Sequence, residues 1–137
     1  MWFTYAILSA IFAALTAIFS KIGVKNMDSN LATAIRTLVI MLITWGIVFF
    51  TGVHKSIPVL SGREILFLVL SGVATGLSWL FYFKAIQLGD ISKVAPIDKL
   101  SIVFVVLLAA LFLHEAISIK TGIGVLLILG GVIVLTI

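Results

Sequence analysis

Charge is scarce in this sequence. Only 10% of its 137 residues are charged, and 63% are hydrophobic, whereas a soluble domain has about a quarter charged residues. So little polar surface cannot cover a water-soluble globule. The composition therefore excludes the soluble classes and predicts an integral membrane protein.

Cysteine is absent altogether. This excludes disulfide bonds, thiol chemistry and zinc–cysteine sites. The two histidines, His54 and His114, lie far apart in the sequence, and no nucleophile elbow, HExxH motif or phosphate-binding glycine loop occurs. We therefore expect no enzyme activity, no metal site and no cofactor.

Basic residues are present but never clustered. The net charge is +4, and the nine lysines and arginines are scattered singly. Scattered cations at helix ends and in loops are typical of contacts with lipid headgroups, whereas nucleic-acid binding needs a basic run or patch. We expect the lipid bilayer, and not a nucleic acid, as the surrounding partner.

The apolar runs between charges predict five spans of about twenty residues each. Their ranges are about 2–20, 31–51, 65–83, 94–113 and 119–137. At about 1.5 Å per residue, twenty helical residues cross a hydrocarbon core of about 30 Å. The intervening loops are short and there is no linker, so the sequence predicts an all-α membrane protein with a single domain over residues 1–137.

Three short motifs predict where helices begin. Asp28 stands before the second span and is a good helix-capping residue. Ser61 lies three residues before Glu64, which is the spacing of a capping box. Pro96 is placed near the first turn of the fourth span, where a missing N–H costs least.

Two charged residues fall inside predicted spans. Arg36 lies in the second span with threonines at helical spacing around it, and Asp98 lies about one turn inside the fourth. A charge near the middle of a membrane helix costs about 2.5–3.5 kcal/mol on the lenient scale. Asp98 is therefore expected to face a protein interior or a water-filled cavity, paired with Arg36, Lys21 or Lys99. An alternative interpretation is a helix-start carboxylate that the helix dipole and headgroup water stabilise.

Small and aromatic residues mark three further helix faces. A small, weakly polar face of the first span is formed by Ser9, Ala13, Thr16 and Ser20. Gly72 and Gly76 form a GxxxG pair in the third span, and we interpret them as helix-packing residues. Gly124 and Gly131 share a face of the last span, and the same interpretation applies to them. Trp79 and Tyr82 suit either a pocket wall or an interfacial aromatic belt.

The distribution of cations does not select one membrane orientation. Loop cations number three on the amino-terminal side and two on the other: Lys55, Arg63 and Lys120 against Lys25 and Lys93. When cations inside helices or at helix ends are counted as well, the side opposite the amino terminus has six cations. The four added there are Lys21, Arg36, Lys84 and Lys99. This balance motivates the hypothesis that the chain inserts in both orientations.

Three stretches resemble EamA-type proteins of the drug/metabolite transporter superfamily. The stretch "SAIFAALTAIFSKIG" resembles their first helix, and "ATAIRTLVIML" resembles their second helix with its arginine. The closest likeness runs from "YFKAIQLGDISKVAPIDKL" to the end of the chain. Its matching positions are Tyr82, Ala85, Gly89, Ala95, Pro96, Glu115, Gly122 or Gly124, and Gly130 or Gly131.

The resemblance implies one five-helix EamA unit. Members with two such units carry them inverted in the membrane around a central cavity. We therefore expect an inverted, antiparallel dimer, formed either by two copies of this chain or with a paralogous five-helix partner. The small multidrug resistance type is also similar, but its members need a glutamate in the first helix, and residues 2–20 contain no acid.

The resemblance also suggests where a substrate would bind. The cavity is expected near six residues from helices one to four: Ser9, Thr16, Arg36, Trp79, Tyr82 and Asp98. In this interpretation Asp98 is the coupling or amine-binding group, Arg36 its counter-charge or an anion clamp, and the aromatic residues form the walls.

The expected function is a secondary transporter of a small metabolite or drug in the cell (inner) membrane, which works by alternating access. The alternative is a non-transporting membrane scaffold or an accessory subunit of a heteromeric transporter.

Overall fold

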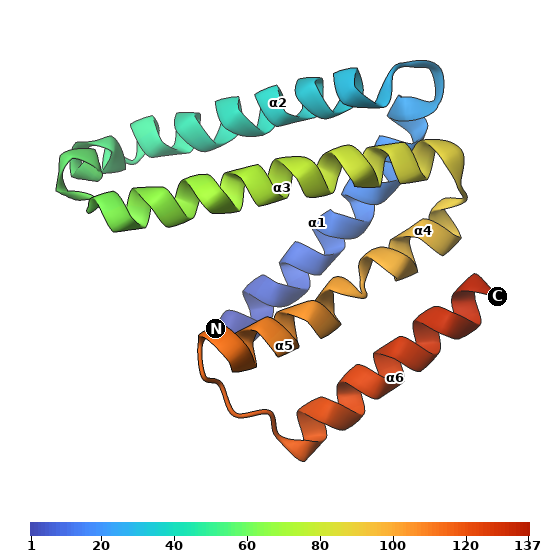
Figure 1. Ribbon diagram of the computed structural model, residues 1–137. Coiled ribbons are helices and arrows are strands. Elements are labelled where there is room, and N and C mark those ends of the chain that lie inside the picture. Colours follow the sequence, from blue (N-terminus) through green and yellow to red (C-terminus); the bar gives the residue numbers. More distant parts are fainter. The chain divides into compact units, whose positions relative to one another are not determined.

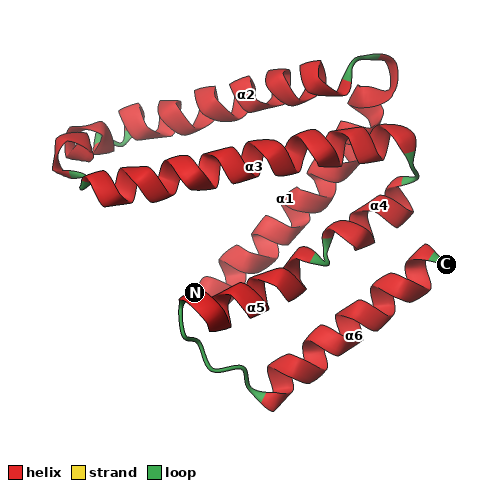
Figure 2. Cartoon of the chain, in the orientation of Figure 1, coloured by secondary structure: helices red, strands yellow, loops and turns green.

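The structure is a computed structural model that describes residues 1–137, apart from the side chain of Pro58. Every regular element of these residues is helical (Figure 2). Five helical segments are long and apolar enough to cross a membrane. The prediction of an all-α membrane protein with five spans is therefore confirmed.

The helices are labelled in Figure 1. They are α1 (Trp2–Gly23), α2 (Ser29–Phe50), α3 (Gly62–Leu88), α4 (Ile91–Asp98), α5 (Ser101–Phe112) and α6 (Ile119–Thr136). Two short 3₁₀ helices, η1 (Val24–Asn26) and η2 (Val53–Val59), follow α1 and α2. The helices α1 and α2 have 22 residues each, which gives a length of about 33 Å and suffices to cross the hydrocarbon core.

The chain divides into two compact units, Met1–Gln87 and Leu88–Ile137. The first unit contains α1, α2 and nearly all of α3, and the second contains α4, α5 and α6. The single-domain organisation over residues 1–137 stays a prediction.

Side-chain caps fix two helix starts in the first unit, as the sequence predicts. The Asp28 carboxylate accepts hydrogen bonds from the backbone N–H groups of Asn30 (2.8 Å) and Leu31 (3.2 Å). The Glu64 carboxylate accepts from the Ser61 N–H at 2.7 Å, and the Ser61 hydroxyl accepts from the Glu64 N–H at 3.2 Å. These bonds satisfy N–H groups that have no partner within the helix.

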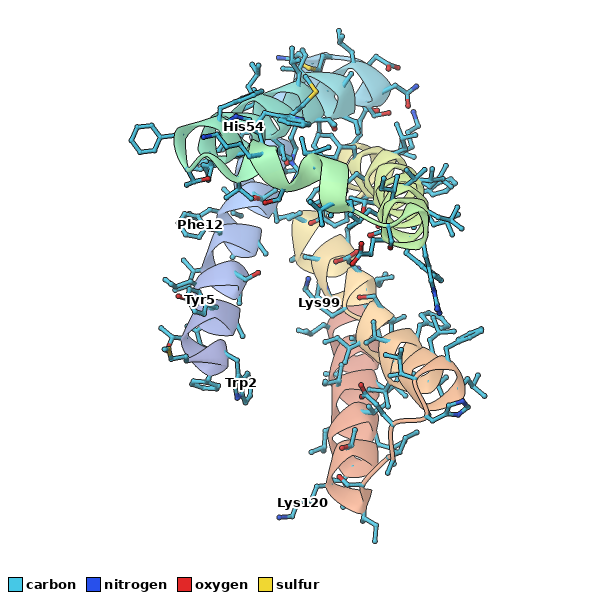
Figure 3. The ribbon with its side chains drawn as sticks, turned by 90° about the vertical axis from the view of Figure 1, so that its left-hand side faces the viewer. Trp2, Tyr5, Phe12, His54, Lys99 and Lys120 are labelled. Atoms are coloured by element: carbon cyan, nitrogen blue, oxygen red, sulfur yellow. The ribbon has the colours of Figure 1, made fainter. Side chains whose placement is uncertain are left out.

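The core of the first unit is small and lies at one end of its helices. Its buried residues come from the end of α1, from η1, from the start of α2 and from the end of α3: Ser20, Val24, Ser29, Ala32, Thr33, Phe83 and Ile86. Towards the start of α1, side chains such as Trp2, Tyr5 and Phe12 project outward (Figure 3). Large exposed apolar side chains over most of each helix are what a lipid environment requires.

Two polar side chains close this core. The Lys21 ammonium donates a hydrogen bond to the Ile86 carbonyl near the end of α3. The Gln87 amide donates to the carbonyls of Val24 (3.3 Å) and Met27 (2.9 Å). Carbonyls at a helix end lack helical partners, so a donor from a neighbouring segment both satisfies them and ties the segments together. We call these three bonds the Lys21–Gln87 clamp.

The second unit departs from the sequence prediction in one respect. A single helix is predicted over 94–113, but the structure has α4 and α5 with a break at Lys99 and Leu100. At the break the Lys99 N–H donates to the Pro96 carbonyl and the Leu100 N–H to the Ile97 carbonyl, at 3.0 and 2.9 Å. These bonds span three residues, as in a 3₁₀ helix. Pro96 lacks a donor for the Ser92 carbonyl one turn earlier, so its missing N–H does not by itself account for the bonds that change at Lys99 and Leu100.

Helix α6 packs against both α4 and α5, as Figure 1 shows. Val132 is the buried residue of α6. The start of α6 is capped by Ser118, whose hydroxyl accepts from the Thr121 N–H at 3.1 Å. The second unit is therefore a packed group of three helices in which one membrane span is interrupted near Asp98.

Candidate functional site

Arg36 stacks on an aromatic side chain of the neighbouring helix. Its guanidinium carbon lies 3.4 Å from the centre of the Trp79 ring and 6.0 Å from that of Phe83. Cations within about 6 Å of a ring centre are attracted by the negative face of the ring, most strongly for tryptophan. Among the described residues of the first unit, no carboxylate forms a salt bridge with Arg36. The arginine therefore has an aromatic platform but no counter-charge within its unit.

The platform is held by neighbouring aromatic residues on α3. The Trp79 and Phe83 rings are 5.8 Å apart at 61°, and the Trp79 and Tyr82 rings are 5.5 Å apart at 78°. Both are edge-to-face arrangements, which aromatic pairs prefer. Because Trp79 and Phe83 are four residues apart, they share one face of the helix. Tyr82 contacts the edge of this platform through the Trp79 ring.

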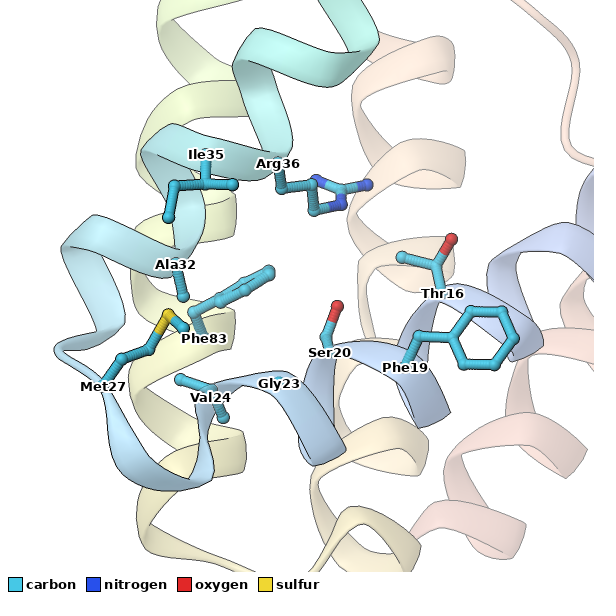
Figure 4. Close-up of a pocket in the computed structure, with 10 residues that line it drawn as sticks. All are labelled: Thr16, Phe19, Ser20, Gly23, Val24, Met27, Ala32, Ile35, Arg36 and Phe83. Atoms are coloured by element: carbon cyan, nitrogen blue, oxygen red, sulfur yellow. The ribbon is translucent and has the colours of Figure 1, made fainter.

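A cavity of about 350 Å³ adjoins Arg36. Its lining comes from α1, η1, α2 and α3, together with the η1–α2 loop (Figure 4). The lining residues are Thr16, Phe19, Ser20, Gly23, Val24, Met27, Ala32, Ile35, Arg36 and Phe83. This volume lies in the lower part of the range of about 300–1,000 Å³ that is usual for small-molecule sites.

Two hydroxyl groups join Arg36 at this cavity. Thr16 and Ser20 are one helical turn apart on α1, and in Figure 4 their hydroxyls and the Arg36 guanidinium project toward the same open space. The threonines of α2 behave differently, since Thr33 and Thr37 donate to the carbonyls four residues earlier, both at 2.8 Å. Among the described residues, the hydroxyls of Thr16 and Ser20 have no such partner.

The structure thus brings together three of the six predicted cavity residues. Thr16 and Arg36 line the cavity, and Trp79 supports Arg36. Tyr82 contacts Trp79 and is not among the lining residues. Ser9 lies seven residues before Thr16, about two helical turns away, on an exposed part of α1. The role of each residue in substrate binding stays a prediction.

Asp98 lies in the second unit, at the end of α4. Its carboxylate forms a salt bridge of 3.2 Å with Lys99, one of the three partners that the sequence suggests. The two side chains are 38% and 56% exposed, so the pair is not a buried one. Its position at an interrupted span is the notable feature, because broken membrane helices present unsatisfied backbone groups to ligands.

The four predicted packing glycines have open surroundings. A Cβ atom added at Gly72, Gly76, Gly124 or Gly131 would meet nothing within 4 Å. These glycines are therefore not required by close contacts within their own unit. Their role in packing against another chain stays a prediction.

The six predicted cavity residues leave out part of the cavity wall. Phe83 and Ser20 line it, although only their helical neighbours Trp79 and Thr16 are predicted as site residues. Each of the two lies four residues after its predicted neighbour and therefore on the same helix face, and this spacing in the sequence indicates them as lining residues. No pattern in the sequence indicates that Val24 and Met27 line the cavity, because their positions depend on how η1 and the loop after it turn at the end of α1.

Comparison with known proteins places this geometry in context. The profile of the EamA-like transporter family matches residues 1–137. An "Uncharacterized transporter in cobO 3'region" from Sinorhizobium sp. is 48% identical over 136 residues, which cover 99% of this chain and 96% of that protein.

A second relative matches part of the chain. It is described as "Probable 4-amino-4-deoxy-L-arabinose-phosphoundecaprenol flippase subunit ArnE", from Enterobacter sp. (strain 638), and is 37% identical over 68 residues. The match covers 50% of this chain and 64% of that protein. No solved structure matches the chain.

Proposed function

The chain belongs to the EamA-like transporter family, and from this premise we propose that it is a secondary transporter that moves a small solute by alternating access. It is a multi-pass membrane protein with five apolar helices, and its family is one of transporters and not of enzymes. The proposed location is the cell (inner) membrane.

The observation that carries the proposal is the cavity beside Arg36. Most surfaces of α1, α2 and α3 are apolar and exposed, yet the charge and free hydroxyls of Arg36, Thr16 and Ser20 converge on one cavity. An intramembrane charge is costly and is usually retained for a function. A polar cavity among lipid-facing helices is the element that a transporter needs and a passive scaffold does not.

We assign Asp98 a coupling role in this mechanism. It lies where the span formed by α4 and α5 is interrupted, and discontinuous helices with unwound backbone form ion and substrate sites in many transporters. The salt bridge with Lys99 is exposed, so it can open without a large loss of stability. The Asp98 carboxylate would then release the Lys99 ammonium and bind a proton or a cationic group of the substrate.

The proposed partner is a second five-helix unit in the opposite orientation. The family resemblance implies an inverted pair of such units around one cavity, and the balanced cations allow either orientation. The open faces at Gly72 and Gly76 would admit a closely packed helix from that unit. The partner is either a second copy of this chain or a paralogous chain.

A second candidate function is an accessory subunit of a heteromeric transporter. The relative from Enterobacter is described as a flippase subunit, which favours assembly with a different chain. The name of that relative also specifies an amino sugar and a phosphorylated polyprenol. A lipid-linked phosphate is therefore one solute class that transport assays on this chain should include.

The test is solute exchange in proteoliposomes that contain the purified chain. Vesicles loaded with one unlabelled solute are diluted into the same labelled solute, for a panel of anions, cations, zwitterions and lipid-linked phosphates. We expect saturable exchange for at least one solute, and its loss in Asp98→Asn. If no solute exchanges until a second five-helix chain is added, the accessory-subunit function replaces the homomeric one. If none exchanges in either case, the transport proposal fails.

A further inference from the structure

The N–H donors of Arg36 are not used in a salt bridge within the described part of the first unit. The Trp79 ring covers one face of the guanidinium at 3.4 Å, and stacking of this kind leaves the N–H groups at the edge available. Within the described part of the first unit these N–H groups meet no carboxylate. An arginine that is stacked but unpaired is preorganised for a carboxylate or a phosphate, which it can bind through two parallel hydrogen bonds.

The hydroxyl groups extend the donor set onto α1. Thr16 and Ser20 face the same cavity (Figure 4), and Ser20 is only 9% exposed. These hydroxyls face the cavity and have no intrahelical partner among the described residues, so they can donate to a ligand that enters it. A ligand oxygen in the cavity would accept hydrogen bonds from these hydroxyls and from Arg36 together.

The remaining wall of the cavity is apolar and carries no negative charge. None of the ten described lining residues is acidic. The apolar side chains are Phe19, Val24, Met27, Ala32, Ile35 and Phe83. A cationic ligand would meet the positive charge of Arg36 without a compensating carboxylate, whereas an apolar group attached to an anion would find a matching surface.

We propose that this cavity binds an oxyanion, a carboxylate or a phosphate, that is attached to a small apolar group. Arg36 and the hydroxyls of Thr16 and Ser20 hold the oxyanion, and the apolar wall holds the rest of the ligand. The inference deepens the proposed function by naming the class of solute, and it rests on that function only for the claim that the bound solute is transported.

The chain offers an intrinsic probe for binding. It has three tryptophans, and the double variant Trp2→Phe/Trp45→Phe leaves Trp79 as the sole reporter next to Arg36. The full-length variant is reconstituted in nanodiscs of phosphatidylcholine, and Trp79 emission is titrated with benzoate and phenyl phosphate. Benzylamine and benzyl alcohol are the matched cationic and neutral probes. We expect saturable changes with the two anions only.

Matched substitutions assign the binding to the proposed groups. Arg36→Gln is expected to weaken anion binding by about tenfold or more, the loss of at least one charge-assisted hydrogen bond. Arg63→Gln is the control, because Arg63 also lies near an aromatic ring, that of Phe67 at 5.9 Å, but does not line this cavity. Ser20→Ala is expected to weaken binding by about threefold to tenfold, and Thr44→Val, which alters an exposed helix face, should not.

A further experiment distinguishes a lipid headgroup from a soluble anion as the source of the bound oxyanion. Phosphatidylglycerol presents a headgroup phosphate with a net negative charge, whereas in phosphatidylcholine the choline neutralises the phosphate. If phosphatidylglycerol competes with benzoate, the site accepts a lipid headgroup. If it does not compete, the site selects soluble oxyanions. Both results support the proposed oxyanion site.

Other results would overturn the inference. It fails if benzylamine or benzyl alcohol binds as tightly as benzoate, or if Arg36→Gln binds benzoate as the parent protein does. Arg36→Lys keeps the charge but loses the two-bond geometry, and it should bind benzoate with intermediate affinity. This variant replaces Arg36→Gln in the test if Arg36→Gln does not fold. Anion binding without exchange in proteoliposomes would refute transport but not the site. Exchange of cations without anion binding would refute the site but not transport.

Discussion

At the scale of the residue, the contact between Arg36 and Trp79 explains how a permanent charge is tolerated in an apolar helix. The guanidinium is only partly buried, and the aromatic face supplies negative potential on one side. The long side chain crosses to α3, where its guanidinium lies over Trp79. The same geometry leaves the hydrogen-bonding edge of the arginine facing the cavity (Figure 4).

A double-mutant cycle tests this contact. For Arg36→Gln and Trp79→Leu, unfolding in detergent should give a coupling free energy of about 0.5–2 kcal/mol, the range of a cation–π interaction. The control cycle is Arg63→Gln with Phe67→Leu, where the cation is 5.9 Å from the ring centre and the coupling should be smaller. Equal coupling in the two cycles would show that the Arg36 stack has no special energetic role.

At the scale of the element, the Lys21–Gln87 clamp holds α1, the segment after it and the end of α3 together. The Val24 side chain is 1% exposed, and its carbonyl receives a hydrogen bond from the Gln87 amide. The rest of α1 has few contacts, since Ser20 is its one buried residue among those described. The orientation of α1, and so the shape of the cavity, therefore depends on a few bonds at its end.

Substitution of Gln87 tests the clamp. Gln87→Glu keeps the size of the side chain but removes the N–H donors, and it leaves the Val24 and Met27 carbonyls without this partner. We expect a decrease in the free energy of unfolding of about 1–3 kcal/mol and faster amide exchange around residues 23–27. Lys84→Met, a change at an exposed position of α3, is the control and should alter neither. Unchanged exchange in Gln87→Glu would contradict the proposed role.

The break between α4 and α5 is the second feature at this scale, and substitution of Pro96 tests whether the proline contributes to it. Pro96→Ala restores a backbone donor and removes the clash with the carbonyl of the preceding turn. We expect a firmer α4, with slower amide exchange over residues 92–96 by mass spectrometry, and an unchanged break at Lys99 and Leu100. The α2 segment in the same sample is the internal control and should not change. Slower exchange over residues 99–103 as well would contradict this expectation and show that Pro96 sets the break.

At the scale of the whole molecule, the account requires that this five-helix unit meet an inverted partner. Asn26 and Ser56 stand beyond opposite ends of α2, both exposed, and the chain has no cysteine of its own. Single substitutions Asn26→Cys and Ser56→Cys therefore report membrane orientation cleanly. The account predicts that an impermeant maleimide labels about half of each variant in intact cells, as expected for insertion in both orientations.

The contrary result is equally clear. If one variant is labelled completely and the other not at all, every copy has one orientation, and an inverted homodimer is excluded. A paralogous partner of opposite orientation would then be required.

Much of this architecture could be predicted from the sequence, because bilayer thickness and hydropathy fix the number and length of the spans. Caps such as Asp28 and the Ser61–Glu64 pair were also predictable, since they depend on local spacing. The break at Lys99 was missed, although Pro96 was noted, because hydropathy does not register a change in hydrogen-bond pattern. The clamp at Gln87 was missed because it joins segments about sixty residues apart.

The central claim is that this chain transports a solute through the cavity that Arg36 lines. The most direct measurement is exchange of labelled benzoate or phenyl phosphate in proteoliposomes, compared among the parent protein, Arg36→Gln and Arg63→Gln. The account predicts saturable exchange by the parent protein and Arg63→Gln, and exchange at the level of empty vesicles for folded Arg36→Gln. Equal exchange by all three proteins, or none by the parent protein for any solute tested, would contradict it.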